Sequence, residues 1–180
     1  GTSLYDRPVT ILGGGGITEE LLRQLALYRC EVTVVRRRPE PLDGAARVLT
    51  TDRLHDALPG AQVVFVALAL TPETTGLMSA AAFAAMKPSA MFVNVARGKV
   101  ADEAALIATM KAGKIAAAAL DVTVEEPLPE ASPLWTMPDV FITPHTAGET
   151  RAYEDNVLDI LMENLARLWK GDQVLRNQVL

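Results

Sequence analysis

The chain has 180 residues, of which 49% are hydrophobic and 22% charged, and its net charge is −5. This composition predicts a globular domain and excludes general disorder, and the acidic balance argues against sequence-independent nucleic-acid binding. One cysteine and two separated histidines provide neither an internal disulfide nor a metal site, and no apolar run is long enough to span a membrane. We therefore expect a cytoplasmic domain with no metal, nucleic-acid or membrane partner.

Short β-rich runs alternate with helix-like runs along the chain. Strands are predicted at residues 9–12, 32–35, 63–66, 91–94, 115–120 and 140–142. Helices are predicted at residues 17–28, from Thr51 or Asp52 to about 59, at 80–86 after Ser79, from Asp102 to Gly113, and from about 149 to 170. Residues 39–44 are predicted to form a surface loop, and 127–138 an irregular excursion. Because the strands are apolar throughout and joined by helices, we predict an α/β fold, a Rossmann-type doubly wound parallel sheet with helices on both faces, as a single domain.

Four consecutive glycines, residues 13–16, follow the first predicted strand and precede the first helix. Gly13, Gly15 and Thr18 have the spacing of a dinucleotide-binding turn, with threonine at the third position. In such a turn the first glycine permits a tight bend, and the second lets a pyrophosphate approach the helix N-terminus. The alternative is a glycine-rich turn without a ligand. The predicted cofactor contacts here are Gly13, Gly15, Gly16 and Ile17.

Three arginines follow the second predicted strand, and Arg36 stands 23 residues after Gly13. An acidic residue about 20 residues beyond the glycines would bind the ribose hydroxyls of NAD, but no acid is near this position. A guanidinium can instead hold a 2′-phosphate through paired hydrogen bonds. We therefore expect NAD(P)(H), with NADP(H) favoured by Arg36 and Arg37. The alternative is a solvated basic loop.

Charged and polar residues follow three of the predicted strands, in segments 94–98, 121–126 and 143–148. The carboxyl ends of parallel strands meet at one edge of a sheet, and ligands of open α/β sheets bind there. An arginine, a glutamate and a histidine are thus expected to converge beside a bound nicotinamide.

Six further motifs follow the glycine turn in order along the chain, at residues 70–74, 86–88, 94–98, 119–122, 126–128 and 143–145. On these motifs the chain, from the glycine turn to the last helix, resembles the D-isomer-specific 2-hydroxyacid dehydrogenases. That family includes glyoxylate/hydroxypyruvate reductases and phosphoglycerate dehydrogenases. The resemblance implies hydride transfer between NAD(P)H and a small 2-oxo or D-2-hydroxy acid.

The resemblance also implies roles for particular residues. His145 matches the proton donor and acceptor, Glu126 the carboxylate that pairs with it, and Arg97 the group that binds the substrate carboxylate and carbonyl. Glu125 is the neighbouring alternative to Glu126. Histidine suits proton transfer near neutral pH, and a guanidinium suits a carboxylate. The positions that match the cofactor site are Thr74, Val95, Ala96, Arg97, Asp121, His145 and Gly148.

Relatives in this family have a second, substrate-binding domain that mostly precedes the glycine turn. Only eight residues precede Val9 here, whereas a domain needs on the order of a hundred. We therefore expect residues 1–180 to be the NAD(P)-binding domain alone, with about 172–180 as a tail toward the other domain. The resemblance implies a homodimer. The chain alone is expected to bind cofactor with little turnover, and the alternative function is a non-catalytic dinucleotide sensor.

Overall fold

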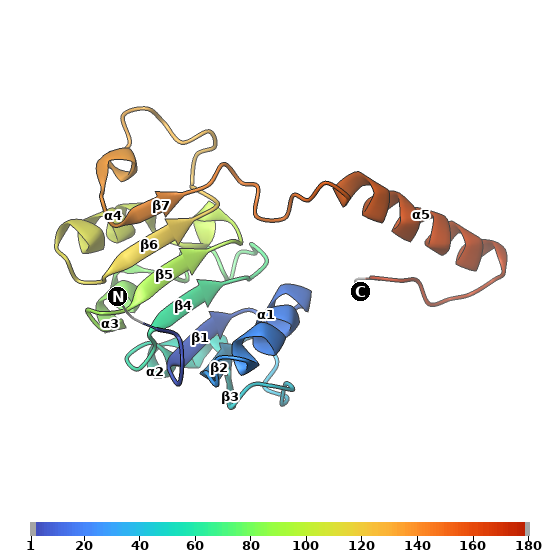
Figure 1. The fold of residues 1–180 in the computed structure, drawn as a ribbon, viewed down its shortest axis with the longest axis horizontal. Helices are drawn as coiled ribbons and strands as arrows, with labels where there is room; N and C mark the ends of the chain where they lie inside the picture. The colour runs from blue at the N-terminus through green and yellow to red at the C-terminus, as the bar shows by residue number, and fades with distance from the viewer. Residues whose placement is uncertain (1–2, 179–180) are drawn as a thin grey trace. The chain divides into compact units, whose positions relative to one another are not determined.

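The computed structural model describes residues 3–178, and the chain divides into two compact units, one ending at His145 and the other beginning at Thr146. The first unit contains a sheet of seven parallel strands in the order β3-β2-β1-β4-β5-β6-β7 (Figure 1). The strands are β1 (Pro8–Leu12), β2 (Glu31–Val35), β3 (Arg47–Leu49), β4 (Val63–Val66), β5 (Met91–Asn94), β6 (Ala117–Leu120) and β7 (Val140–Ile142). The predicted Rossmann-type sheet is confirmed.

Helices lie on both faces of the sheet, because each strand directs alternate side chains to opposite faces. On one face α1 (Gly16–Ala26) buries Leu22 and Leu25 against β1 and β2 (Figure 1). On the other face a larger core includes residues of α2 (Leu54–Ala57), α3 (Ala80–Ala85) and α4 (Glu103–Lys111). Short 3₁₀ turns complete the unit: η1 (Thr51–Arg53), η2 (Gly98–Val100) and η3 (Pro133–Thr136).

Side-chain caps fix the beginnings of two helices. The Ser79 hydroxyl accepts the N–H of Ala82 at the start of α3, and the Asp102 carboxylate accepts the N–H of Ala105 at the start of α4. Both caps were expected from the sequence. The expected cap at Thr51 or Asp52 is wrong: Thr50 is the N-cap of η1, and its side chain makes no capping bond.

One strand was missed and several element boundaries differ from the sequence expectation. The edge strand β3 was missed because it has only three residues and begins with an exposed arginine. Helix α1 ends at Ala26, where turns of three residues follow and Arg29 adopts a φ of 52°. In the second unit α5 (Tyr153–Trp169) begins later than residue 149, because hydrogen-bonded turns occupy the preceding segment.

Helix α5 has no buried residue within the described part of the chain. Its apolar stripe of Val157, Leu158, Leu161 and Leu168 is about half exposed. Whether the tail after α5 leads toward a second domain stays a prediction, and its residues 179 and 180 lie outside the described residues. None of the described helices is long and apolar enough to cross a membrane.

Candidate functional site

The segments that follow the strands begin side by side along the carboxyl edge of the sheet. Hydrogen bonds continue one residue beyond the strands: the N–H groups of Val95, Asp121 and Thr143 donate to carbonyls at the ends of β4, β5 and β6. The N–H of Gly13 likewise donates to Val35 at the end of β2. The glycine turn and the segments that carry Arg97, Asp121 and His145 therefore leave the sheet at the same edge.

The glycine turn leaves open space at the start of α1. A Cβ on Gly13 would lie 2.6 Å from the carbonyl oxygen of Ala67, and its φ of 129° also favours glycine. In contrast, a Cβ on Gly15 or Gly16 would meet nothing within 4 Å. Gly15 is the N-cap of α1, where no described side chain caps the helix. The open space and the uncapped N–H groups fit a pyrophosphate.

Thr18 occupies the third position of the glycine motif and is completely buried. Its hydroxyl has no hydrogen-bond partner within residues 3–178. The side chain therefore serves the close contact between α1 and the sheet, which glycine or alanine makes in the usual motif.

Arg36 lies over the glycine turn. A Cβ on Gly14 would be 2.5 Å from its Cδ atom, and only 17% of the Arg36 side chain is exposed. The guanidinium donates to the carbonyl of Glu40 at 2.7 Å and lies 3.9 Å from the Glu40 carboxylate, while its Nε has no partner among the described residues. A guanidinium is thus held beside the glycine turn.

The loop after β4 approaches the same corner. The Thr74 hydroxyl accepts the N–H of Thr71 and donates to the carbonyl of Ala69, both at 2.7 Å, so its contacts fix the shape of the loop. A hydrogen bond with Thr71 is the main cause that lowers the pKa of Glu73, and the charge of Arg37 lowers it further. Arg37 itself is exposed.

A buried asparagine shapes the turn after β5. Asn94 is 1% exposed; its Oδ1 accepts the N–H of Ala96 at 3.1 Å, and its Nδ2 donates to the carbonyl of Arg97 at 3.2 Å. These bonds fix the backbone of Val95, Ala96 and Arg97, whose exposed guanidinium also donates to the carbonyl of Ala96. Asn94 was not among the predicted site residues, although a polar residue that ends a buried strand is a signal for a role in the site.

Asp121 follows β6 and is buried. It accepts a hydrogen bond of 2.5 Å from the hydroxyl of Thr143, which follows β7. This bond fastens the turn after β6 to the turn that leads to His145.

His145 and Glu126 form a hydrogen-bonded pair, with 2.7 Å between Nδ1 and Oε2. Partial burial raises the pKa of Glu126, but hydrogen bonds from His145 and the Thr123 N–H outweigh it, together with the charges of His145 and Arg97. The pKa of this carboxyl therefore lies below its usual value of 4.5. His145 has a φ of 57°, a left-handed conformation that is uncommon outside glycine. Glu126, and not Glu125, makes the contact.

The His145–Glu126 pair borders a cavity of about 410 Å³ in the first unit. Much of its wall is apolar, from Leu128, Trp135 and Ile142. The indole of Trp135 donates to the carbonyl of Pro129 at 3.0 Å, which fixes the ring at this position. The cavity provides room for a small ligand beside the His145–Glu126 pair.

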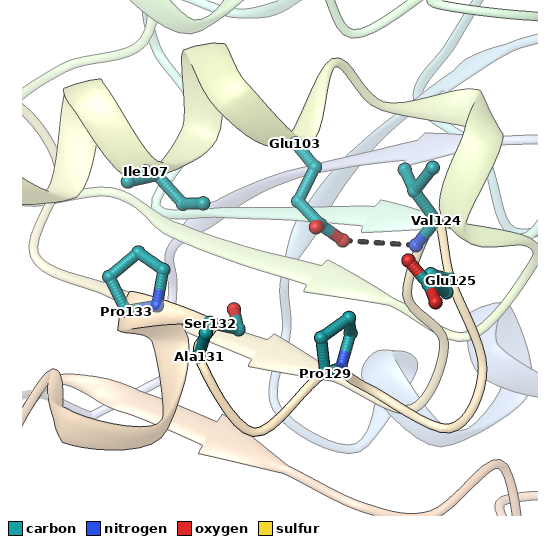
Figure 2. A pocket seen from close by; sticks show the side chains of 8 residues that line it. All are labelled: Glu103, Ile107, Val124, Glu125, Pro129, Ala131, Ser132 and Pro133. Carbon is teal, nitrogen blue, oxygen red and sulfur yellow. Dashed lines mark hydrogen bonds between the residues drawn. The ribbon is translucent and has the colours of Figure 1, made fainter.

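A second hollow lies between α4 and the segment of residues 124–133, and Glu103 and Ile107 line it from the helix (Figure 2). The Glu103 carboxylate accepts the N–H of Val124 at 3.0 Å. This contact attaches the segment of residues 124–133 to α4. Neither Glu103 nor Thr123 was among the predicted site residues.

The structure thus brings most of the predicted residues into two groups along one edge, while their roles stay predictions; Arg37 and Thr74 belong to neither group. The first group, at the glycine turn, comprises Gly13, Gly15, Gly16, Ile17 and Arg36. The second, after β5 to β7, comprises Val95, Ala96, Arg97, Asp121, Glu126 and His145. Gly148 belongs to the second unit and is not placed relative to these groups.

Comparison with known proteins identifies the family. The sequence profile described as "D-isomer specific 2-hydroxyacid dehydrogenase, NAD binding domain" matches residues 1–147. Glyoxylate/hydroxypyruvate reductase A of Photorhabdus laumondii is 35% identical over 171 residues, which cover 93% of this chain and 54% of that protein. Glyoxylate/hydroxypyruvate reductase B of Citrobacter koseri is 38% identical over 176 residues, with coverage of 95% and 53%.

A solved structure agrees with these relatives. The D-isomer specific 2-hydroxyacid dehydrogenase from Xanthobacter autotrophicus Py2, crystallised with NADPH and MES, has a TM-score of 0.87 and 40% identity, covering 96% of this chain and 70% of that one. The chain spans about half the length of the two reductases. Its match to the profile over 147 residues, with the parallel sheet and the glycine turn, shows that it belongs to the D-isomer specific 2-hydroxyacid dehydrogenase family, as the NAD binding domain.

Proposed function

We propose that the chain is the cofactor-binding half of an enzyme that reduces a small 2-oxo acid to a D-2-hydroxy acid with NAD(P)H. The observation that carries the proposal is the 2.7 Å contact between His145 and Glu126, at the same sheet edge as Arg97 and the glycine turn. Two reductases of glyoxylate and hydroxypyruvate among its relatives support the substrate class.

The proposed chemistry divides among three side chains. The nicotinamide, when bound, supplies the hydride. Arg97 holds the substrate carboxylate through paired hydrogen bonds and polarises the neighbouring carbonyl. His145 gives its proton to the carbonyl oxygen, and in the reverse direction removes it. Glu126 orients the imidazole through Nδ1, which leaves Nε2 for the substrate.

The cofactor is proposed to lie along the edge with its pyrophosphate at Gly15 and Gly16. Their open space and the uncapped start of α1 support this placement. Arg36 is proposed to bind a 2′-phosphate and to favour NADPH, and a relative solved in complex with NADPH supports this cofactor class. Further parts of the proposal are a substrate domain elsewhere in the whole protein, a cytoplasmic location and a homodimer, which rest on the family resemblance.

Parallel calorimetric titrations with NADPH and NADH test the proposal on this chain. Wild type should bind NADPH more tightly, and Arg36→Gln should weaken NADPH binding about tenfold or more while leaving NADH binding nearly unchanged, because a guanidinium–phosphate bond contributes about 1.5–3 kcal/mol. Arg38→Gln, a change at an exposed arginine of the same triplet, is the control.

The outcomes separate the parts of the proposal. Preference for NADH would keep the dehydrogenase and reject the phosphate contact. Binding of neither cofactor would reject the cofactor-binding function of this chain. In a protein that carries both halves, His145→Ala should abolish reduction of glyoxylate or hydroxypyruvate, and a variant that binds NADPH and still turns over normally would reject the role of His145.

A further inference from the structure

The segment that carries Arg97 is in contact with the turn that carries Glu126. Gly98 follows Arg97, and a Cβ there would overlap the carbonyl group of Thr123 and the nitrogen of Val124. Only glycine lets these two backbones lie so close. The charge of Arg97 also contributes to lowering the pKa of Glu126, as expected for groups on touching segments.

Glu103 provides a second attachment to the same turn. It stands one residue after the Asp102 cap, in the first turn of α4, where the capped backbone holds its position. Figure 2 shows its side chain extending from α4 to the backbone nitrogen of Val124, which donates to Oε2 at 3.0 Å. Ile107, one helical turn later, lines the same hollow, so one face of α4 lies along the segment of residues 124–133.

The turn that Glu103 holds also fixes the Glu126 side chain. The Thr123 N–H donates to Oε1 of Glu126 at 3.0 Å, and the Thr123 hydroxyl donates to the carbonyl of Glu125 at 2.7 Å. Oε1 is thereby engaged within the turn, and Oε2 faces Nδ1 of His145. Each step of this path from α4 to the imidazole is a hydrogen bond or a peptide link.

We propose that Glu103 is a positioning residue: by accepting the N–H of Val124 it holds the turn of residues 123–126 in the form in which Glu126 orients His145. It touches neither substrate nor cofactor in this assignment. The proposal rests on the proposed function, which gives the His145–Glu126 pair its catalytic role. Its test is independent of that role and needs neither substrate nor cofactor.

Carbon-13 NMR titration of the Glu126 carboxyl group gives the test, on the 180-residue chain. Glu103→Ala removes the acceptor of the Val124 N–H, so Thr123 and His145 lose their alignment with Glu126. The Glu126 titration should then move to higher pH by about 0.5 or more. Loss of the Glu103 charge alone would move it the opposite way, because removal of a nearby negative charge favours ionisation. The two explanations therefore differ in sign.

Two further variants separate geometry from charge. Glu103→Gln removes the charge but keeps an oxygen acceptor, so the Glu126 titration should stay at or below its wild-type position. Glu125→Ala removes a charge from the turn itself but keeps the backbone carbonyl that accepts the Thr123 hydroxyl, and should likewise not raise it. Amide exchange at Val124 should increase about tenfold in Glu103→Ala and remain near wild type in Glu103→Gln.

The proposal is overturned if Glu103→Ala leaves the Glu126 titration unchanged or lowers it, or if Glu103→Gln raises it as much as alanine does. Because the glutamine variant keeps the contact, it provides a folded comparison even where alanine lowers stability. Failure of both NADPH and NADH to bind would reject the proposed function and leave this titration result standing, so the two failures are distinguishable.

Discussion

The two groups of site residues along the sheet edge are built in opposite ways. At the glycine turn, a Cβ on Gly15 or Gly16 would meet no atom within 4 Å, and α1 begins without a side-chain cap. After β5 to β7, a Cβ on Gly98 would overlap the neighbouring backbone, and Asn94 fixes the turn after β5 from within. Glu103 and Thr143 tie the turn after β6 to α4 and to the turn after β7. Glycine thus leaves room for a ligand in one region, while in the other it lets two chain segments touch. Substitutions in the two regions should therefore affect different measurements.

The largest effect is expected at Gly98. In Gly98→Ala the new methyl group overlaps the backbone of Thr123, so the turn must move, at a cost of about 3 kcal/mol in free energy of unfolding. Urea unfolding followed by circular dichroism measures this loss. Gly60→Ala, at a glycine with nothing within 4 Å, is the matched control and should change stability by less than about 1 kcal/mol. Equal effects of the two substitutions would contradict the close contact.

Thr143→Val should have the next largest effect. It replaces the hydroxyl that donates to buried Asp121 with a methyl group of similar size. Loss of this hydrogen bond to a buried polar side chain costs about 1–3 kcal/mol, which urea unfolding at neutral pH can measure. Thr143→Ser keeps the hydroxyl and should retain most of the stability; a serine variant as unstable as the valine variant would show that packing, and not this bond, is responsible.

Gly15→Ala should separate the two regions most clearly. The added methyl group meets no protein atom, and the φ of −101° suits alanine, so the free energy of unfolding should change by less than about 0.5 kcal/mol. The same methyl group would occupy the space proposed for the pyrophosphate, and affinity for NADPH should fall about tenfold or more. Calorimetry measures the affinity, and unchanged binding would place the cofactor elsewhere.

The same contrast explains what the sequence could predict. The open turn has a sequence signature, because glycines between an apolar strand and a helix leave few alternatives, and the apolar runs likewise located β4, β5 and β7. The region after β5 to β7 depends instead on contacts between segments that are far apart in the chain. Glu103 and Val124 are 21 residues apart, and so no spacing rule indicates their hydrogen bond. The edge strand β3 was not predicted for a related reason: within the described residues it pairs with β2 alone, and it has three residues.

The smallest predicted effect concerns the charge of Glu126. Because its folded-state pKa lies below the usual 4.5, the ionised carboxylate stabilises the fold above that pH, and the stabilisation disappears as the pH falls through the folded-state pKa. The side chain is 38% exposed, so solvent screening limits the contribution to below about 1 kcal/mol. Glu126→Gln cannot titrate, yet its amide oxygen can still accept the Thr123 N–H.

Unfolding free energies of wild type and Glu126→Gln should therefore differ most at pH 6 and converge toward pH 3. The other titrating groups are common to the two proteins, so the pH dependence of the difference reports on Glu126 together with the groups coupled to it, His145 and Arg97. A difference that stays constant with pH would mean that the carboxylate gains nothing from His145 and Arg97. A converging difference would instead show that the charge of Glu126 stabilises the region after β5 to β7. At the glycine turn, in contrast, the proposed role depends on open space for a ligand.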